Sequence, residues 1–485
     1  MRGATNEPGP RDKAGAVVTS EPVLRTTTVG LPLGLALALA LALALALAPA
    51  LFAGADAHAN PAGVVPTAAY PGIGEEVHFR ADYEYDIDSA LITREQVGNP
   101  AADPLAPLPR SRDLQFHQTR HLLTPRIELG LYHNVWVSFA TPIILGQSRE
   151  LDLASGVDRA NSSTFADGIL PGNGFDARDP TTAPAGNLVF RGVNRAGVPE
   201  LRGGLGLAPM NQALDPTKPT WKLGVEGRFA IGRVMRFDAV DPGNEAGIST
   251  GVHELRVWTS VDRRFSHFEG WFEVFWQLPI YTRKTALFKD PGFGATNVDL
   301  SQTAGASFGL ETYLVNDAET GNRVSLDLGA RMTAHFEGRG YSEMWEVFAL
   351  AGDPRRAGPL VLDGDPTMTG EQAVRHPGIS NIENYLETAG RIALRAKLGT
   401  HVAFAALGEV IWKTDHTINF ADAGVDLPAC PIGSPRCEDE VNDLVNPGTQ
   451  EVNPLHVRTI DLVGHRYRSE ENRGYVLGAE VQILF

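Results

Sequence analysis

The chain has 485 residues, of which 43% are hydrophobic, and it contains 51 glycines and 33 prolines. This composition is typical of many strands separated by turns and excludes a disordered chain. The mean hydropathy of −0.12 excludes a bundle of transmembrane helices, which would need several apolar runs of ~20 residues. The net charge of −16 argues against nucleic acid as a partner.

One long apolar run is present, at 31–52, and its centre at 35–48 alternates leucine with alanine. Both residues are strong helix formers and nothing polar marks a second face, so the run indicates a helix and not a strand. Basic residues precede it, and Ala57 and Ala59 are small residues at the two positions that a signal peptidase reads. We therefore predict that residues 1–59 are an export signal cleaved after Ala59. An uncleaved anchor helix is the alternative.

Residues 60–75 are rich in proline, glycine and alanine and are expected to form a short periplasmic lead-in. A two-sided pattern then begins at Val77, where apolar residues at every second position oppose polar ones, as in an extended strand with two different faces. The same pattern recurs about twelve times, each time over nearly the ~10 residues that a tilted strand needs to cross a membrane. The segments that carry it lie at 77–87, 126–131, 135–143, 200–207, 221–231, 254–262, 272–280, 307–314, 323–332, 391–397, 401–413 and 475–485.

The connections between these segments alternate between short and long. A barrel with short periplasmic turns, long outer loops and both ends in the periplasm requires this alternation and an even number of strands. One further pair of strands hidden in the long loops would make about fourteen. The short connections fall near 132–134, 213–219, 264–268, 315–321 and 398–400, and the long ones near 88–113, 147–198, 238–250, 284–303, 337–383 and 418–473.

The two cysteines, Cys430 and Cys437, lie in the last long connection. An exported chain meets an oxidising compartment, so we predict a disulfide between them. Metal binding is the poorer alternative, because no second Cys or His pair lies nearby in the sequence.

The last segment, 475–485, has one wholly apolar face that starts at Tyr475 and ends in Phe485, and an opposite face that carries Glu480 and Gln482. It resembles the closing strand of Gram-negative outer-membrane β-barrels. The resemblance implies that this strand pairs with the first one. It also implies that Tyr475 and Phe485 belong to a signal that the barrel assembly machinery recognises.

A second, shorter resemblance concerns two strands. The sequence from Glu200 to Leu207, followed by that from Lys222 to Phe229, is similar to hairpins of transporter-type barrels associated with aromatic-compound degradation. This resemblance implies uptake of small organic molecules.

Charged residues occupy the polar face of the predicted strands. Arginine or lysine near the membrane midplane would cost ~2–4 kcal/mol if it faced lipid, so the charged face must line the lumen of the barrel. There we expect opposite charges to alternate. The predicted lumen residues are Arg80, Glu84, Arg126, Glu128, Arg202, Glu226, Arg228, Glu254, Arg256, Glu273, Glu311, Asp327, Arg331, Arg391, Arg395, Glu409 and Glu480.

The sequence predicts no catalytic, cofactor or metal site. His117 and His121 would be ~13 Å apart on a strand, too far to share an ion. The Gly-x-Ser-x-Gly match at 305–309 overlaps the predicted strand at 307–314, so it is not the strand-to-helix elbow of hydrolases, and we expect no enzyme.

These observations predict an all-β, antiparallel, up-and-down barrel of residues 76–485 in the outer membrane. We expect a monomer that contacts membrane lipid and acts as a passive channel or transporter for small solutes. A structural or adhesive protein that works through its large surface loops is the alternative.

Overall fold

The computed structural model describes residues 77–96, 108–132, 134–283, 285–287, 300–317, 319–363, 373–399, 401–420 and 457–484. The predicted export signal, the lead-in, both cysteines and Phe485 lie outside the described residues. The predictions about them stay predictions, as do the domain boundaries.

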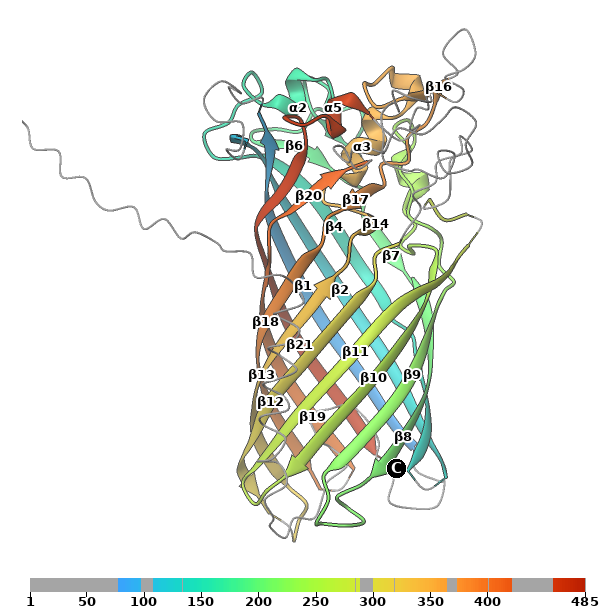
Figure 1. The fold of residues 1–485 in the computed structure, drawn as a ribbon, viewed down its shortest axis with the longest axis vertical. Coiled ribbons are helices and arrows are strands. Elements are labelled where there is room, and N and C mark those ends of the chain that lie inside the picture. The colour runs from blue at the N-terminus through green and yellow to red at the C-terminus, as the bar shows by residue number, and fades with distance from the viewer. Residues whose placement is uncertain are drawn as a thin grey trace, which may run out of the picture.

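Twelve antiparallel strands close into one barrel (Figure 1). The first and last strands pair along most of their length, with Ala81 opposite Val481. The predicted all-β barrel of about twelve strands is thereby confirmed. In order around the wall the strands are β1 (Val77–Glu95), β2 (Arg110–Tyr132), β3 (Val135–Ala140), β8 (Glu200–Met210), β9 (Thr220–Ala230), β10 (Val252–Arg264), β11 (Phe268–Thr282), β12 (Thr303–Asn316), β13 (Arg323–His335), β18 (Tyr385–Leu398), β19 (Val402–Lys413) and β21 (Tyr467–Leu484).

Shorter elements gather at the end of the barrel that carries the long connections (Figure 1). None of the helices in the described part of the chain is long and apolar enough to cross a membrane. The shorter elements are β4 (Ile143–Leu153), α2 (Ser163–Ala166), β5 (Phe175–Asp176), β6 (Leu188–Arg191), β7 (Arg195–Gly197), η1 (Pro242–Glu245), β14 (Gly338–Gly340), α3 (Trp345–Ala351), η2 (Pro354–Arg356), β15 (Leu362–Asp363), β16 (Ala373–Val374), β17 (Ser380–Ile382), β20 (His416–Asn419) and α5 (Arg458–Asp461).

Apolar side chains on the wall strands are exposed, and the polar side chains between them are buried. Leu328, Leu394 and Leu477 are 52%, 52% and 58% exposed, whereas Asp327 and Ser325 are 0% and 1% exposed. An apolar outer band on a closed antiparallel barrel faces lipid. The protein is therefore an outer-membrane β-barrel.

Several strands extend further toward the outer end than the sequence predicted. β1 continues to Glu95 and β2 begins at Arg110, so the expected loop 88–113 is much shorter. The loop expected to begin at 147 starts after Leu153, and β21 begins at Tyr467 within the expected loop 418–473.

Two prolines interrupt one part of the wall. β3 and β4 are separated at Pro142, and β7 and β8 at Pro199. Because proline cannot donate to a strand ladder, the β3–β8 pairing ends at Ala140 opposite Arg202. On the outer side of the two prolines the wall continues with an irregular pairing of β4 and β7.

On the inner side of the wall, four aromatic residues each lie directly opposite a glycine of the neighbouring strand. A Cβ atom added to Gly206 would meet the ring of Trp136 at 2.2 Å, and one at Gly224 would meet Trp258 at 2.4 Å. The ring therefore covers the glycine instead of projecting across the lumen. The pairs are Trp136 with Gly206, Trp258 with Gly224, Trp271 with Gly309 and Phe275 with Gly305.

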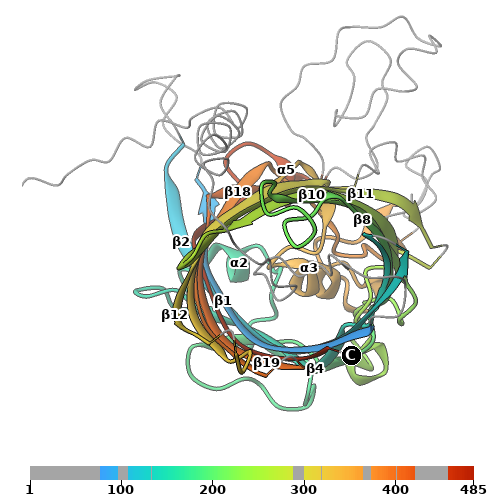
Figure 2. The same cartoon turned by 90° about the horizontal axis from the view of Figure 1, so that it is seen from below.

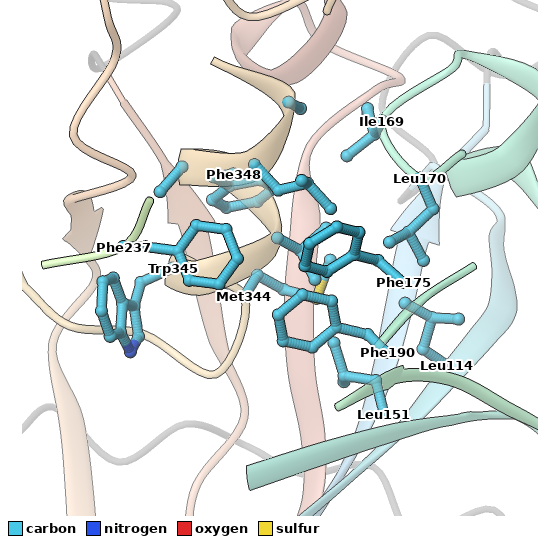
Figure 3. Close-up of a cluster of buried hydrophobic side chains, with 14 of the residues drawn as sticks. Leu114, Leu151, Ile169, Leu170, Phe175, Phe190, Phe237, Met344, Trp345 and Phe348 are labelled. Carbon is cyan, nitrogen blue, oxygen red and sulfur yellow. The ribbon is translucent and has the colours of Figure 1, made fainter. Parts of the chain in front are cut away.

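The outer segments that carry α2, β5, β6, α3 and Phe237 fold over the barrel mouth. We call them the cap, and they share one apolar core (Figure 3). All seven residues of α3 are buried, and seen along the barrel α2 and α3 lie within the outline of the wall (Figure 2). Trp345 and Phe348 of α3 pack in one cluster with Phe175, Phe190 and Phe237. Burial of large apolar side chains of this kind stabilises the inward position of the cap.

Candidate functional site: a charged cavity in the lumen

Two kinds of buried contact join the cap to the wall. Arg195 of β7 forms an ion pair with Glu346 of α3, with 2.7 Å between Nη2 and Oε1, and both residues are almost fully buried. Arg149 of β4 donates to the carbonyl oxygen of Ser342 at 2.7 Å. The guanidinium groups of both arginines lie over the ring of Trp345. The cap is thus attached to the wall by polar contacts as well as by its apolar core.

Below the cap, one group of predicted lumen residues forms ion pairs across the strands β2 and β8–β11. Arg126 contacts Glu128 at 2.9 Å and Glu226 at 3.3 Å, and Arg228 contacts Glu226 at 3.2 Å. These contacts bring four predicted residues into one network.

The same side of the lumen holds the remaining predicted residues of β8, β10 and β11. Arg202 pairs with Glu200 at 2.7 Å, and Arg256 pairs with Glu273 at 2.6 Å. Glu254 accepts a hydrogen bond of 2.7 Å from Gln277. This side of the lumen is therefore braced by neighbouring opposite charges.

Near the short turns, buried carboxylates lie side by side on neighbouring strands. Glu311 is directly opposite Asp327 and accepts a hydrogen bond from Ser325. Trp271 donates to Asp327 at 3.2 Å, and Arg395 lies 3.9 Å from the same carboxylate. Because these groups are buried, they fill the lumen at this level.

On the opposite side, a cavity of about 400 Å³ lies among β1, β13, β18, β19 and β21, with Arg120 of β2 reaching its wall. It brings together Arg80, Glu84, Arg331, Arg391, Glu409 and Glu480 of the predicted set. Arg331 pairs with Glu409 at 2.6 Å and with Glu387 at 3.1 Å.

A second cavity of about 160 Å³ shares Asp88 and Lys413 with the first. Tyr385 and His416 line it, together with Arg149 and Ser342, the pair that connects the wall to the cap. The two cavities together lead from the middle of the lumen to the underside of the cap.

The predicted set omitted several charged residues of the first cavity: Asp82, Asp86, Asp88, Arg120, Glu387 and Lys413. Asp88 lies beyond Ile87, where the predicted strand ended, and Arg120 lies before the predicted segment at 126–131. A longer reading of the alternation would have included Asp88, because Asp82, Glu84, Asp86 and Asp88 follow one another at every second position.

Among the described residues, no group of three or more His, Cys, Asp or Glu residues is arranged to hold a metal ion. His121 instead contacts Tyr83, with 2.8 Å between Nδ1 and the phenolic oxygen.

No protein-family model matches the sequence, and no curated protein matches it. Among solved structures, the chain is similar to the COG4313 outer membrane channel from Pseudomonas putida F1, with 9% identity, coverage of 85% of this chain and 96% of that one, and a TM-score of 0.36. A Pseudomonas aeruginosa FadL homologue shows 9% identity, coverage of 84% and 90%, and a TM-score of 0.29. The outer membrane protease OmpT from Escherichia coli shows 7% identity, coverage of 84% and 97%, and a TM-score of 0.24.

Proposed function

We propose that the barrel is a passive, non-enzymatic channel for small polar solutes and works as a monomer. The observation that carries this proposal is the pair of adjoining charged cavities inside a closed wall. A lumen built only to brace the wall would be filled by paired side chains at every level. The polar path below the cap instead leaves room for a solute and water.

In this conformation the cap covers the outer end of that path. We infer that solutes pass when α3 moves away from the wall, which requires the ion pair between Arg195 and Glu346 to separate. Removing one partner of a buried pair leaves an unpaired buried charge, so either single replacement weakens the closed position strongly.

Single-channel recording of the refolded mature chain in planar bilayers tests this proposal. We expect wild type to open rarely and Glu346→Ala to stay open for at least about ten times longer, because losing over ~1.4 kcal/mol of closure changes the equilibrium tenfold. Glu471→Ala is the matched control, since Glu471 forms an exposed pair with Arg112 at the outer rim. Silent bilayers with wild type and Glu346→Ala alike, with both proteins folded, would contradict a channel.

A structural or adhesive role is the second candidate, and the ordered cap favours it. Its described segments share one apolar core. If Glu346→Ala does not conduct while its cap is shown by proteolysis to be loosened, this second role takes first place.

A further inference from the structure

The first cavity has an acidic column on one wall. Asp82, Glu84, Asp86 and Asp88 occupy four successive inward positions of β1, and all of them line the cavity. Asp86 is 7% exposed, and its Oδ1 atom has no hydrogen-bond partner among the described residues. A buried carboxylate oxygen without a donor is costly, so a ligand that donates there is favoured.

Carboxylates exceed bases in this cavity. Seven carboxylates and five basic side chains line it, an excess of two negative charges. Four of the bases are already engaged: Arg80 pairs with Asp82, Arg120 with Asp86 and Lys413 with Asp88, while Arg331 is shared between two glutamates.

Two carboxylates and one base of the cavity have no ion pair among the described residues. The carboxylates are Glu84 and Glu480, and the base is Arg391, which lies within electrostatic reach of Glu409 and Glu480. The balance of unpaired charge therefore favours a cation in the cavity.

Beside the acidic column, on the next two strands of the wall, is an aliphatic strip formed by Leu407, Ile411 and Val476 of β19 and β21. The strip lies close to the wall because β21 has glycines beneath it: a Cβ atom at Gly478 would meet Leu407 at 2.8 Å. Glu84, Gly478 and Leu407 stand in one row across three adjacent strands. Val476 is the direct partner of Asp86, so apolar surface and a carboxylate lie one strand spacing, ~4.8 Å, apart.

We propose that this cavity binds small amphipathic organic cations, with the ammonium group at the acidic column and the hydrocarbon part on the aliphatic strip. A bare inorganic cation would leave the strip without a partner, and a neutral apolar solute would leave the carboxylates unpaired. The inference deepens the proposed channel function by naming its solute class, and as a transport statement it rests on that function.

Isothermal titration calorimetry on the full mature chain, purified from the outer membrane in detergent, tests the site without requiring conductance. The probes are n-butylammonium, methylammonium and butyrate. Butylammonium should bind most tightly, methylammonium more weakly because it does not cover the strip, and butyrate not measurably. Equal binding of butylammonium and butyrate, or no binding of butylammonium, would overturn the site.

Two variants and one control locate the binding. Glu84→Gln combined with Glu480→Gln should weaken butylammonium at least about tenfold, since each replacement removes an unpaired charge of the cavity. Leu407→Ala should reduce the affinity for butylammonium and leave that for methylammonium unchanged. Glu254→Gln is the control, because Glu254 is a lumen carboxylate on β10 outside the cavity. An equal loss in Glu254→Gln would mean general attraction to an acidic lumen and would refute the site.

The two proposals fail separately. Binding with this pattern but no conductance in any variant would reject the channel and keep the site. Conductance without butylammonium binding would reject the site and keep the channel.

Discussion

At the scale of single residues, the wall depends on glycines that leave room for inward aromatic rings. Trp136 is 1% exposed and lies over Gly206, so its ring cannot move aside into open lumen without losing buried contacts. The glycine is required here by close approach of a side chain and not by its backbone conformation.

Replacing Gly206 by alanine should therefore destabilise the barrel. The added Cβ would lie 2.2 Å from the Trp136 ring, and overpacking of this kind costs about 1–3 kcal/mol. Gly390→Ala is the matched control, because no atom lies within 4 Å of the Cβ that it would add. Urea unfolding in lipid vesicles, followed by tryptophan fluorescence, measures both. Equal unfolding midpoints would show that the ring does not pack as described.

Also at residue scale, the buried His376 of the cap is held neutral. Burial, together with the nearby charge of Arg339, lowers the pKa of its imidazole to about 3. The ring lies against that of Phe420, with ring centroids 4.0 Å apart and an angle of 40° between the planes, and Nδ1 accepts a hydrogen bond from the backbone N–H of Gly378 at 2.9 Å. A protonated ring would lose this acceptor and would bring a second cation beside Arg339.

At the scale of the cap, this shift predicts opening on acidification. The folded pKa lies below the ordinary value of 6.5, so the contribution of His376 is complete above pH 6.5 and is lost as the pH falls toward 3. At pH 5 the loss is about 2 kcal/mol. Hydrogen exchange of α3 should accelerate between pH 7.5 and 5 after correction for the intrinsic rate, and less so in His376→Gln. His267 lies in an exposed short turn, so His267→Gln should behave as wild type. If the exchange of α3 accelerates as much in His376→Gln as in wild type, His376 is not the cause.

The strands that form the wall could be predicted from the sequence, and the cap could not, for one physical reason. Where lipid lies outside and water inside, every second residue must change polarity, as at Leu328 and Asp327. Higher up, the cap fills the lumen, so the inward residues Ala90 and Ile92 of β1 and Phe116 of β2 are apolar and pack on it. The alternation disappears there, which is why the upper ends of β1 and β2 were not predicted.

The helix α3 gives no comparable signal in the sequence. Its seven residues are buried from all sides by segments far away in the chain, among them Phe175, Phe190 and Phe237. A short apolar helix without a polar face has no periodicity that a sequence pattern can show. Its role as part of a cap follows only from these distant contacts.

At the scale of the whole molecule, the lumen has two different sides. Between β2 and β11 the charges are paired with close neighbours, as in Arg256 with Glu273. Between β13 and β1 they surround a cavity with an excess of carboxylates. If solutes pass through the lumen, the side with unpaired charges determines which ions enter. The electrostatic potentials of two closely paired opposite charges largely cancel.

The ion selectivity of the open channel should therefore depend on the few lumen arginines whose positive charge offsets the excess of carboxylates. Arg391 has no ion pair among the described residues, and Arg395 lies 3.9 Å from the Asp327 carboxylate. Replacing both by alanine removes two positive charges from the lumen and should raise the ratio of cation to anion permeability several-fold.

The reversal potential in a salt gradient measures this ratio, recorded in the Glu346→Ala background so that the cap does not limit opening. Arg112→Ala is the control, because the Arg112 side chain is about half exposed at the outer rim and its charge is screened by salt. Refolding must be checked for each variant by resistance to SDS before heating, which a closed barrel provides. A reversal potential that shifts equally in the control would place selectivity at the mouth. No shift in either variant would mean that Arg391 and Arg395 only brace the wall, and the structural role of the barrel would then be favoured over transport.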